Sequence, residues 1–301
     1  MTIDDVIAGV PAWAGLDVGV EPIDGGLTNN NFRLTVGAER FCVRIPGRDS
    51  SLLAVDRVAE WRNTVAAAAS GAGAAVVATV GDVPVMVLEW IDGEVQSGES
   101  LRRDASVPKI AAAIRRLHAG PAFVNEFNMF RIAEGYLRLV QERGFEIPAD
   151  YADHLPTVRR IEQAMAVRGG DLRPCNNDLL AANYIDTPDG FRIIDYEYSG
   201  MNDPCFELGN TWAESELNAD QLRVLCREYF GDDLRNRVAR ARLWSVMSNY
   251  GWTLWAAIQH AVSEIEFDFW EWGIDGKYAR AVAAMSGAGF GGWLDDVVRS
   301  D

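Results

Sequence analysis

The feature that most restricts the fold of this chain is a change in sequence pattern about a third of the way along it. Before residue 93, short apolar stretches alternate with turn residues, as at Gly81-Asp82, which indicates strands joined by tight turns. After that point apolar residues recur at helical spacing, and one short hairpin is predicted over 183–194. The pattern predicts an α+β protein with an antiparallel-sheet lobe over residues 1–92 and a mostly helical lobe over 93–301.

Local signals position the individual elements within these lobes. Thr2 is followed by acids suited to the first turn of a helix, and Pro108 stands in the first turn of another. The predicted strands cover 18–23, 31–36, 41–45, 75–80 and 83–90, and the predicted helices cover 2–13, 52–69, 106–119, 125–143, 152–167, 204–230 and 233–263.

The balance of charge excludes several functions. Asp and Glu number 44 against 28 Lys and Arg, which gives a net charge of −16. Such a surface repels nucleic acid and anionic lipid and attracts cations. The sequence shows no apolar run long enough to span a bilayer, and its N-terminus is acidic where a signal peptide is basic. We therefore expect a soluble, cytoplasmic protein without nucleic-acid or membrane partners; the sequence gives no oligomeric state.

The few cysteines and histidines weigh against two further classes of site. The four cysteines have no paired metal-ligand spacing, and the three histidines are far apart in the sequence. A zinc site built on histidine and a Ser-His-Asp triad are therefore both disfavoured. We expect reduced thiols.

A stretch of polar residues in the second half carries the strongest functional signal. Asp178 precedes Asn183 by five residues, and Asp195 ends the following strand. Phosphoryl transfer needs a carboxylate to orient the attacking hydroxyl and oxygen ligands to hold Mg²⁺, and these three residues supply that set. The alternative is a loop of ordinary turn residues, because Asn and Asp are common in turns.

The same stretch resembles the choline/ethanolamine kinase family, within the wider aminoglycoside-phosphotransferase and protein-kinase-like superfamily. Cys175–Asn183 is similar to the family's Cys-His-Asn-Asp-Leu-x-x-x-Asn, and the segment from Ile194 to Tyr198 is similar to its Ile-Asp-Phe-Glu-Tyr. The resemblance implies a two-lobed protein-kinase-like fold. It also implies that Asp178 is the catalytic base or hydroxyl-orienting group, that Asn183 and Asp195 bind magnesium, and that Glu197 lies beside them on the substrate side.

One residue departs from the family pattern. Asn176 stands where the family has a histidine that ties the catalytic loop to the second metal-binding Asp. An amide also donates and accepts hydrogen bonds, so we expect a change in rate or stability rather than an inactive site. A catalytically weak pseudokinase that binds a nucleotide or an amine remains an alternative.

A glycine-containing segment between two predicted strands points to the phosphates of ATP. Glycine lets a backbone approach a phosphate closely, and turn amides can bind anions. The run Gly25-Gly26-Leu27-Thr28-Asn29-Asn30 resembles the family's Gly-Gly-Leu-Thr/Ser-Asn segment. The resemblance implies that the ATP-binding residues here are Gly26, Thr28, Asn29 and Asn30.

Further positions complete the predicted nucleotide site. Arg44 matches the family's cation that contacts the α- and β-phosphates, and Glu60 matches the acid that pairs with it. Glu60 could instead be a solvated helix charge, and Asp56 is a rival one turn away. The stretch that ends the last predicted strand of the sheet lobe resembles the family's hinge between the two lobes. There the backbone of Glu89 and Ile91 would bind adenine.

Tryptophans concentrate in the last third of the chain. Trp252 and Trp255 lie in a helix that resembles the family's C-terminal helix, and Trp272 stands where a tyrosine of the family's quaternary-ammonium cage is usual. The resemblance implies that these rings and Glu214 hold the acceptor's ammonium group, and that Glu207 supports the catalytic loop. A choline headgroup has no N–H to donate, so aromatic faces are suited to bind it. The alternative is a bulky core helix.

Together these features predict an ATP- and Mg²⁺-dependent kinase that phosphorylates the hydroxyl of choline or a related small cationic alcohol. The same chemistry could act on ethanolamine, thiamine or an aminoglycoside instead.

Overall fold

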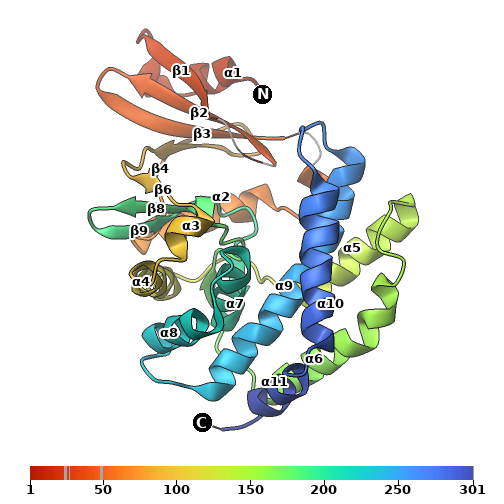
Figure 1. Cartoon of the computed structure of the whole chain (residues 1–301). Coiled ribbons are helices and arrows are strands. Elements are labelled where there is room, and N and C mark those ends of the chain that lie inside the picture. The colour runs from red at the N-terminus through yellow and green to blue at the C-terminus, as the bar shows by residue number, and fades with distance from the viewer. Residues whose placement is uncertain (24–25, 27, 48–49, 301) are drawn as a thin grey trace.

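A computed structural model describes residues 1–23, 26, 28–47 and 50–300 of the chain. An antiparallel sheet forms one end of the molecule, and the remainder is mostly helical, with the chain termini at opposite ends (Figure 1). The strands follow one another across the sheet in the order β1-β2-β3-β5-β4. They are β1 (Val18–Ile23), β2 (Asn29–Val36), β3 (Glu39–Pro46), β4 (Val76–Val80) and β5 (Val85–Glu89).

The two faces of the sheet bury different side chains. Helix α1 (Ile3–Ala8) and Trp13 cover one face, where Val43 and Ile45 of β3 are buried beside them. Because side chains alternate along a strand, Cys42 and Arg44 lie on the opposite face. This alternation turns Arg44 toward the helical part of the molecule.

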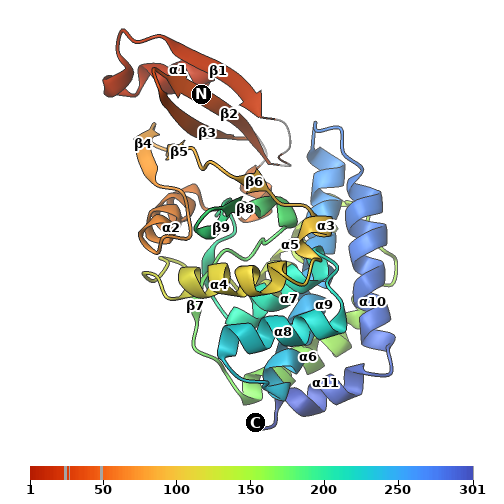
Figure 2. The ribbon, with the colours of Figure 1, turned by 60° about the vertical axis from the view of Figure 1, so that its left-hand side comes forward.

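Helix α2 (Arg57–Ala69) joins the sheet to the helical part (Figure 2). Asp56 caps its N-terminus by accepting hydrogen bonds from two backbone N–H groups. Asn63, which is fully buried, donates to the side chains of Asn125 and Ser199 over 2.7 and 3.1 Å. The helix is therefore fixed to the segment that follows the predicted metal-binding Asp195.

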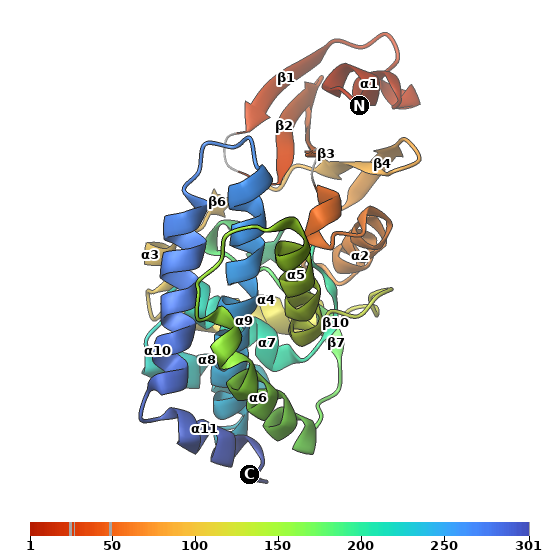
Figure 3. The same cartoon turned by 90° about the vertical axis from the view of Figure 1, so that its right-hand side faces the viewer.

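The helical part is built around α9 (Arg235–Val262), a 28-residue helix with few exposed residues. A helix that is buried on nearly all sides lies in the middle of a bundle, and in α9 this includes polar residues such as Asn249 and Gln259. A π-helix, η5 (Trp270–Tyr278), and α10 (Ala279–Ser286) pack along it (Figure 3). The other helices are α3 (Gly98–Leu101), α4 (Ser106–His118), α5 (Met129–Arg143), α6 (Leu155–Val167), α7 (Pro204–Glu214), α8 (Ala219–Phe230) and α11 (Phe290–Val297).

Short strands frame the catalytic stretch within the helical part. β7 (Arg173–Cys175) pairs with β10 (Gly200–Asn202), and β8 (Tyr184–Thr187) pairs with β9 (Gly190–Ile193). β6 (Glu94–Val95) adds to β8. We propose the boundary between the two lobes at residues 92 and 93, because β6 already pairs within the helical part.

Several predicted helices were wrong in extent; the helix expected over 125–143, for example, begins at Met129 after its cap at Asn128. The helix expected over 2–13 ends at Ala8, because Pro11 has no N–H to continue it, and a 3-10 turn follows. The helix expected over 52–69 begins only after its cap at Asp56. The single helix expected over 204–230 is two helices, α7 and α8, separated where Glu216 adopts a left-handed backbone with φ 52°.

Across the described residues, the structure contains no helix that is both long and apolar enough to cross a membrane.

Candidate active site

Two turns with left-handed residues hold the predicted catalytic groups. Asn177, with φ 69°, follows β7, and Asp195, with φ 65°, follows the strand β9 and Ile194. Asn and Asp tolerate this conformation better than most non-glycine residues, so both turns are possible without glycine. Each turn changes the direction of the chain sharply at the end of a strand.

Asn176 joins these two turns. Its amide group donates to the carbonyl oxygens of Ile194, over 3.2 Å, and Asp195, over 2.6 Å. Its side-chain oxygen accepts a hydrogen bond from the backbone N–H of Asp178 over 3.0 Å. The amide therefore forms the connection between the catalytic loop and the second acid that a histidine makes in the family the sequence resembles.

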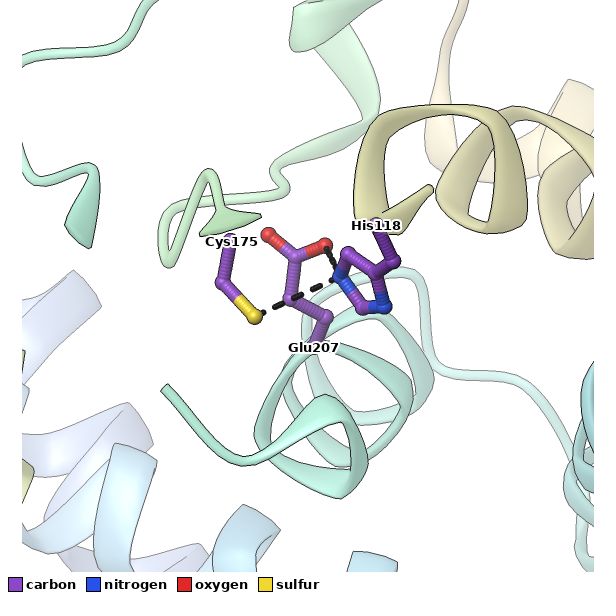
Figure 4. A group of neighbouring side chains, drawn as sticks. All are labelled: His118, Cys175 and Glu207. Atoms are coloured by element: carbon purple, nitrogen blue, oxygen red, sulfur yellow. Dashed lines mark hydrogen bonds and ion pairs between the residues drawn. The ribbon is translucent and has the colours of Figure 1, made fainter. Parts of the chain in front are cut away.

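The buried carboxylate of Glu207 contacts the loop that follows Cys175, and Figure 4 shows it beside Cys175 and His118. One oxygen of Glu207 accepts hydrogen bonds from the backbone N–H groups of Asn176 and Asn177, the latter over 2.9 Å. Its other oxygen lies 2.7 Å from Nε2 of His118, whose Nδ1 lies 2.7 Å from the hydroxyl of Tyr229. Glu207 thus contacts the loop as the sequence implied.

His118, Cys175 and Glu207 are the one group of potential metal-binding side chains of this kind within the described residues. These side chains already have hydrogen-bond partners within the protein. Nε2 of His118 faces the Glu207 carboxylate, and Glu207 accepts a hydrogen bond from the loop. Burial raises the pKa of the Cys175 thiol well above its usual value, which disfavours the thiolate that a metal requires. The group is therefore best explained as a structural support.

Asp178 lies in an acidic environment. Burial, and then the negative charges of Asp195 and Glu197, raise its pKa well above the usual value. Its backbone carbonyl oxygen accepts a hydrogen bond from the amide of Asn183 over 2.7 Å. The predicted base, Asp178, and the two predicted metal ligands, Asn183 and Asp195, therefore belong to one connected site.

Asn183 and Asp195 fit a hard cation chemically. Since Asn183 donates through its amide nitrogen, its oxygen is the atom available to a metal ion, and Asp195 contributes a carboxylate whose side chain is 29% exposed. Oxygen ligands of this kind are those that Mg²⁺ prefers. The donor set therefore suits magnesium better than zinc.

Arg44 and the acids around it connect the sheet to the catalytic stretch. The guanidinium of Arg44 lies 2.6 Å from Asp195, 3.8 Å from Glu60 and 3.9 Å from Glu197. Burial alone would lower the pKa of Arg44, but these carboxylates, Asp195 first, outweigh it and raise it. Burial and the charge of Asp195 likewise raise the pKa of Glu197 to about 7, against the opposing effect of Arg44.

Glu60 and Asp56, the two candidates for the acid that pairs with Arg44, make different contacts. The side chain of Glu60 is 3% exposed and pairs with Arg57 over 2.7 Å, while Asp56 caps α2. Arg57, which the sequence interpretation missed, also pairs with Glu197 over 3.3 Å. An arginine three residues before an inward-facing acid on the same helix was the available signal.

The glycine-containing segment reaches the same acids. Thr28 and Asn29 donate to the two carboxylate oxygens of Glu197 over 2.8 and 2.9 Å. Asn30 is exposed, and Gly26 has a φ of 150° that favours glycine. Gly25 and Leu27 of the predicted segment lie outside the described residues.

The predicted hinge residues lie at the end of β5, the last strand of the sheet in sequence order, and just after it. Glu89 is the last residue of β5, and its carboxylate pairs with Arg192 over 2.8 Å. Ile91 follows and packs, with Cys42, against buried Met86 and Leu88 on the face of the sheet that carries Arg44. An apolar surface at the end of this strand is compatible with a flat aromatic base.

The predicted cage tryptophans form one aromatic cluster. The ring centroids of Trp252 and Trp255 are 6.4 Å apart, and those of Trp255 and Trp272 are 5.9 Å apart. Trp255 donates through its indole N–H to the hydroxyl of Tyr198 over 2.6 Å. Trp252 and Trp255 are almost completely buried, whereas Trp272, on η5, is half-buried.

Glu214 has a partner that the sequence interpretation missed. The ammonium group of Lys277 donates to its carboxylate and lies 4.3 Å from the centroid of the Trp272 ring. Lys277 is 63 positions away from Glu214, so local patterns could not pair them. The available signal was scarcity, because Lys277 and Lys109 are the two lysines of the sequence.

The fold and this site define a phosphotransferase. A family model described as the phosphotransferase enzyme family matches residues 19–243, and the chain belongs to that family. A choline/ethanolamine kinase family protein from Mesorhizobium loti is 32% identical, with a TM-score of 0.85 and 99% of each chain covered. The chain is therefore a phosphotransferase of the choline/ethanolamine kinase type, with a protein-kinase-like fold.

More distant relatives are similar over most of the chain. Mouse ethanolamine kinase 1 is 27% identical, over 86% of this chain and 82% of that protein. The choline kinase LicA from Streptococcus pneumoniae, 24% identical, shares the fold with a TM-score of 0.78, over 95% of this chain and 99% of that chain.

Proposed function

We propose that this protein transfers the γ-phosphoryl group of ATP to the hydroxyl of a small amino alcohol, with choline as the first acceptor to consider. The observation that carries the proposal is the connected set of Asp178, Asn183 and Asp195, together with the Trp252–Trp255 cluster that a hydrogen bond joins to Tyr198, three residues after Asp195. The first group of residues suits phosphoryl transfer, and the second suits a cationic headgroup.

Each residue of the proposed site has a separate task. Asp178 orients the acceptor's hydroxyl, and its raised pKa makes it a better proton acceptor than an ordinary carboxylate. Asn183 and Asp195 would hold Mg²⁺, which neutralises phosphate charge when bound. Arg44 contributes a fixed positive charge for the phosphates, and Glu60, which also pairs with Arg57, holds it in place.

Ethanolamine is the second candidate acceptor. The primary ammonium of Lys277 already forms an ion pair with Glu214 beside the ring of Trp272, which supports a site that can take a primary amine. The name of the mouse relative, ethanolamine kinase 1, points in the same direction.

The deciding experiment is an acceptor screen with the purified protein, in which ADP release is measured with Mg-ATP and choline, ethanolamine, thiamine or an aminoglycoside. Turnover with choline supports the first candidate, and its absence rejects choline. Asp178→Asn should lower kcat by about 10²- to 10⁴-fold while Mg-ATP still binds. A wild type that binds Mg-ATP but turns over none of the acceptors would instead be a pseudokinase.

A further inference from the structure

A lysine occupies the position that the sequence assigned to the acceptor's cationic group. The ammonium of Lys277, on η5, donates to Glu214 and lies 4.3 Å from the centroid of the Trp272 ring. The side chains of Lys277 and Glu214 are 1% and 5% exposed. A carboxylate beside the face of an indole is an environment that binds ammonium ions.

This ion pair lies near the proposed catalytic carboxylate. Burial has the largest effect on the pKa of Asp178, but the negative charge of Glu214 also raises it and the positive charge of Lys277 lowers it. Trp272 packs against Trp255, with ring centroids 5.9 Å apart. A cation that replaced the ammonium of Lys277 would therefore lie against the ring of Trp272, next to Trp255, and within electrostatic range of Asp178.

The choice of lysine at this position is unusual for this chain. Among 28 basic residues the sequence has two lysines, Lys109 and Lys277, and the others are arginines. An ammonium is a compact point charge, whereas a guanidinium is a wide planar group with five N–H donors. Lysine is thus the basic residue whose charged group has the size and shape of a small ammonium ligand.

We propose that Lys277 competes with the acceptor's cationic group for Glu214 and Trp272, and that this competition selects primary over quaternary amino alcohols. The inference rests on the proposed function in one respect, namely that the acceptor is a cation. Removing one member of a buried ion pair is strongly unfavourable unless another charge takes its place. A primary ammonium can donate the hydrogen bond that Glu214 loses, whereas a trimethylammonium group has no N–H.

The test measures binding of cations that carry no hydroxyl group. Tetramethylammonium and methylammonium are titrated into wild type, Lys277→Met and, as a matched control, Lys109→Met, with tryptophan fluorescence and calorimetry as readouts. The side chain of Lys109 is 48% exposed and pairs with Asp186 at the surface. We expect tetramethylammonium to bind Lys277→Met about tenfold more tightly than wild type, and Lys109→Met to match wild type.

Two results would overturn the proposal. One is an unchanged affinity of folded Lys277→Met for tetramethylammonium. The other is an equal gain in affinity for 3,3-dimethylbutanol, the uncharged isostere of choline, because that would reflect added space and not a lost competitor.

A double variant covers the case in which Lys277→Met does not fold, since that change leaves Glu214 buried without a partner. Glu214→Gln with Lys277→Met carries no charge at this position, and exchanging a buried ion pair for neutral groups is often tolerated. Without the competing ammonium, the exposed indole face should bind tetramethylammonium about threefold more tightly than wild type. Affinity no higher than that of wild type would reject the competition.

Steady-state kinetics separate this inference from the proposed function. We expect Lys277→Met to raise the ratio of kcat/KM for choline to that for ethanolamine by about tenfold. An unchanged ratio with measurable turnover rejects the inference and leaves the proposed function in place. Tighter tetramethylammonium binding by Lys277→Met without turnover of either alcohol supports the inference and rejects the proposed acceptor class.

Discussion

At the scale of single residues, Asn176 shows that an amide side chain can form the hydrogen bonds that the family resemblance assigns to a histidine. It donates twice, to the carbonyl oxygens of Ile194 and Asp195, and accepts once, from the N–H of Asp178. An amide has two N–H groups and a carbonyl oxygen, so one side chain can make all three hydrogen bonds. The departure from the family pattern is therefore compatible with an ordered catalytic loop.

Asn176→Ala should impair both stability and turnover. The variant loses three hydrogen bonds and leaves buried polar groups without partners, which should lower the free energy of unfolding by about 1–3 kcal/mol. Urea unfolding and ADP release measure the two effects. Asn176→His is the matched control, because it can restore part of the connection. Wild-type turnover in Asn176→Ala would show that the connection is dispensable.

Glu197 gives the nucleotide-free, metal-free protein a specific pH dependence. Its pKa is about 7 in the native state, against an ordinary value of 4.5. Between these pH values the native state binds more protons than the unfolded chain, so stability decreases as pH rises from about 4.5 to about 7. Each pKa unit corresponds to about 1.4 kcal/mol. Thermal unfolding in EDTA should show a weaker decrease in Glu197→Gln; identical slopes would contradict the shift.

Short motifs were enough to predict which residues of the catalytic stretch lie together, but they could not reveal partners that meet only through tertiary contacts. Asp178, Asn183 and Asp195 are separated by regular, recognisable spacings, and the structure joins them. The importance of Lys277 follows from its contacts with Glu214, which lies on α7, and with the ring of Trp272, which lies on η5 like Lys277 itself. Charge type alone does not reveal that a lysine is buried.

At the scale of elements, η5 is the segment that departs most from what a sequence pattern can predict. The helix α9 was predicted over 233–263 and extends over Arg235–Val262, because an apolar pattern of that length leaves few alternatives. The wider turn of a π-helix matches neither the helical nor the strand period, so Trp270–Tyr278 was not foreseen. Such helices often occur at functional sites.

Close packing fixes η5 against α9, and Gly273 makes it possible. A Cβ atom at Gly273 would lie 2.0 Å from the Cβ of Ala256, which is too short for any contact. Gly273→Ala should displace η5, reduce the free energy of unfolding by about 1–3 kcal/mol and raise the KM of the acceptor more than that of ATP. Calorimetry and kinetics measure these effects.

Gly292→Ala is the matched control, since a Cβ there meets no atom within 4 Å. Because alanine favours a helix over glycine, this change in α11 should be neutral or stabilising by up to about 1 kcal/mol. Equal effects of the two substitutions would contradict a special role for the contact between η5 and α9.

At the scale of the whole molecule, ion pairs and hydrogen bonds close the sheet onto the helical part. Arg44 of β3 pairs with Asp195, and Thr28 and Asn29 donate to Glu197. The partners come from opposite sides of the predicted nucleotide site. In the proposed function phosphates would compete for Arg44 and a metal ion would compete for Asp195, so the nucleotide takes over contacts that connect the two parts.

This exchange predicts how ligands stabilise the protein. Mg-ATP should raise the melting temperature substantially, because a ligand at 100 times its Kd adds about 2.7 kcal/mol to stability. ATP with EDTA should give a smaller shift, since Asp195 then keeps its ion pair with Arg44 and lacks a metal ion to bind. In Asp195→Asn the shifts with and without Mg²⁺ should become nearly equal. A thermal-shift series with ATP, Mg²⁺, both and EDTA measures this, and equal shifts in wild type would argue against Asp195 as a metal ligand.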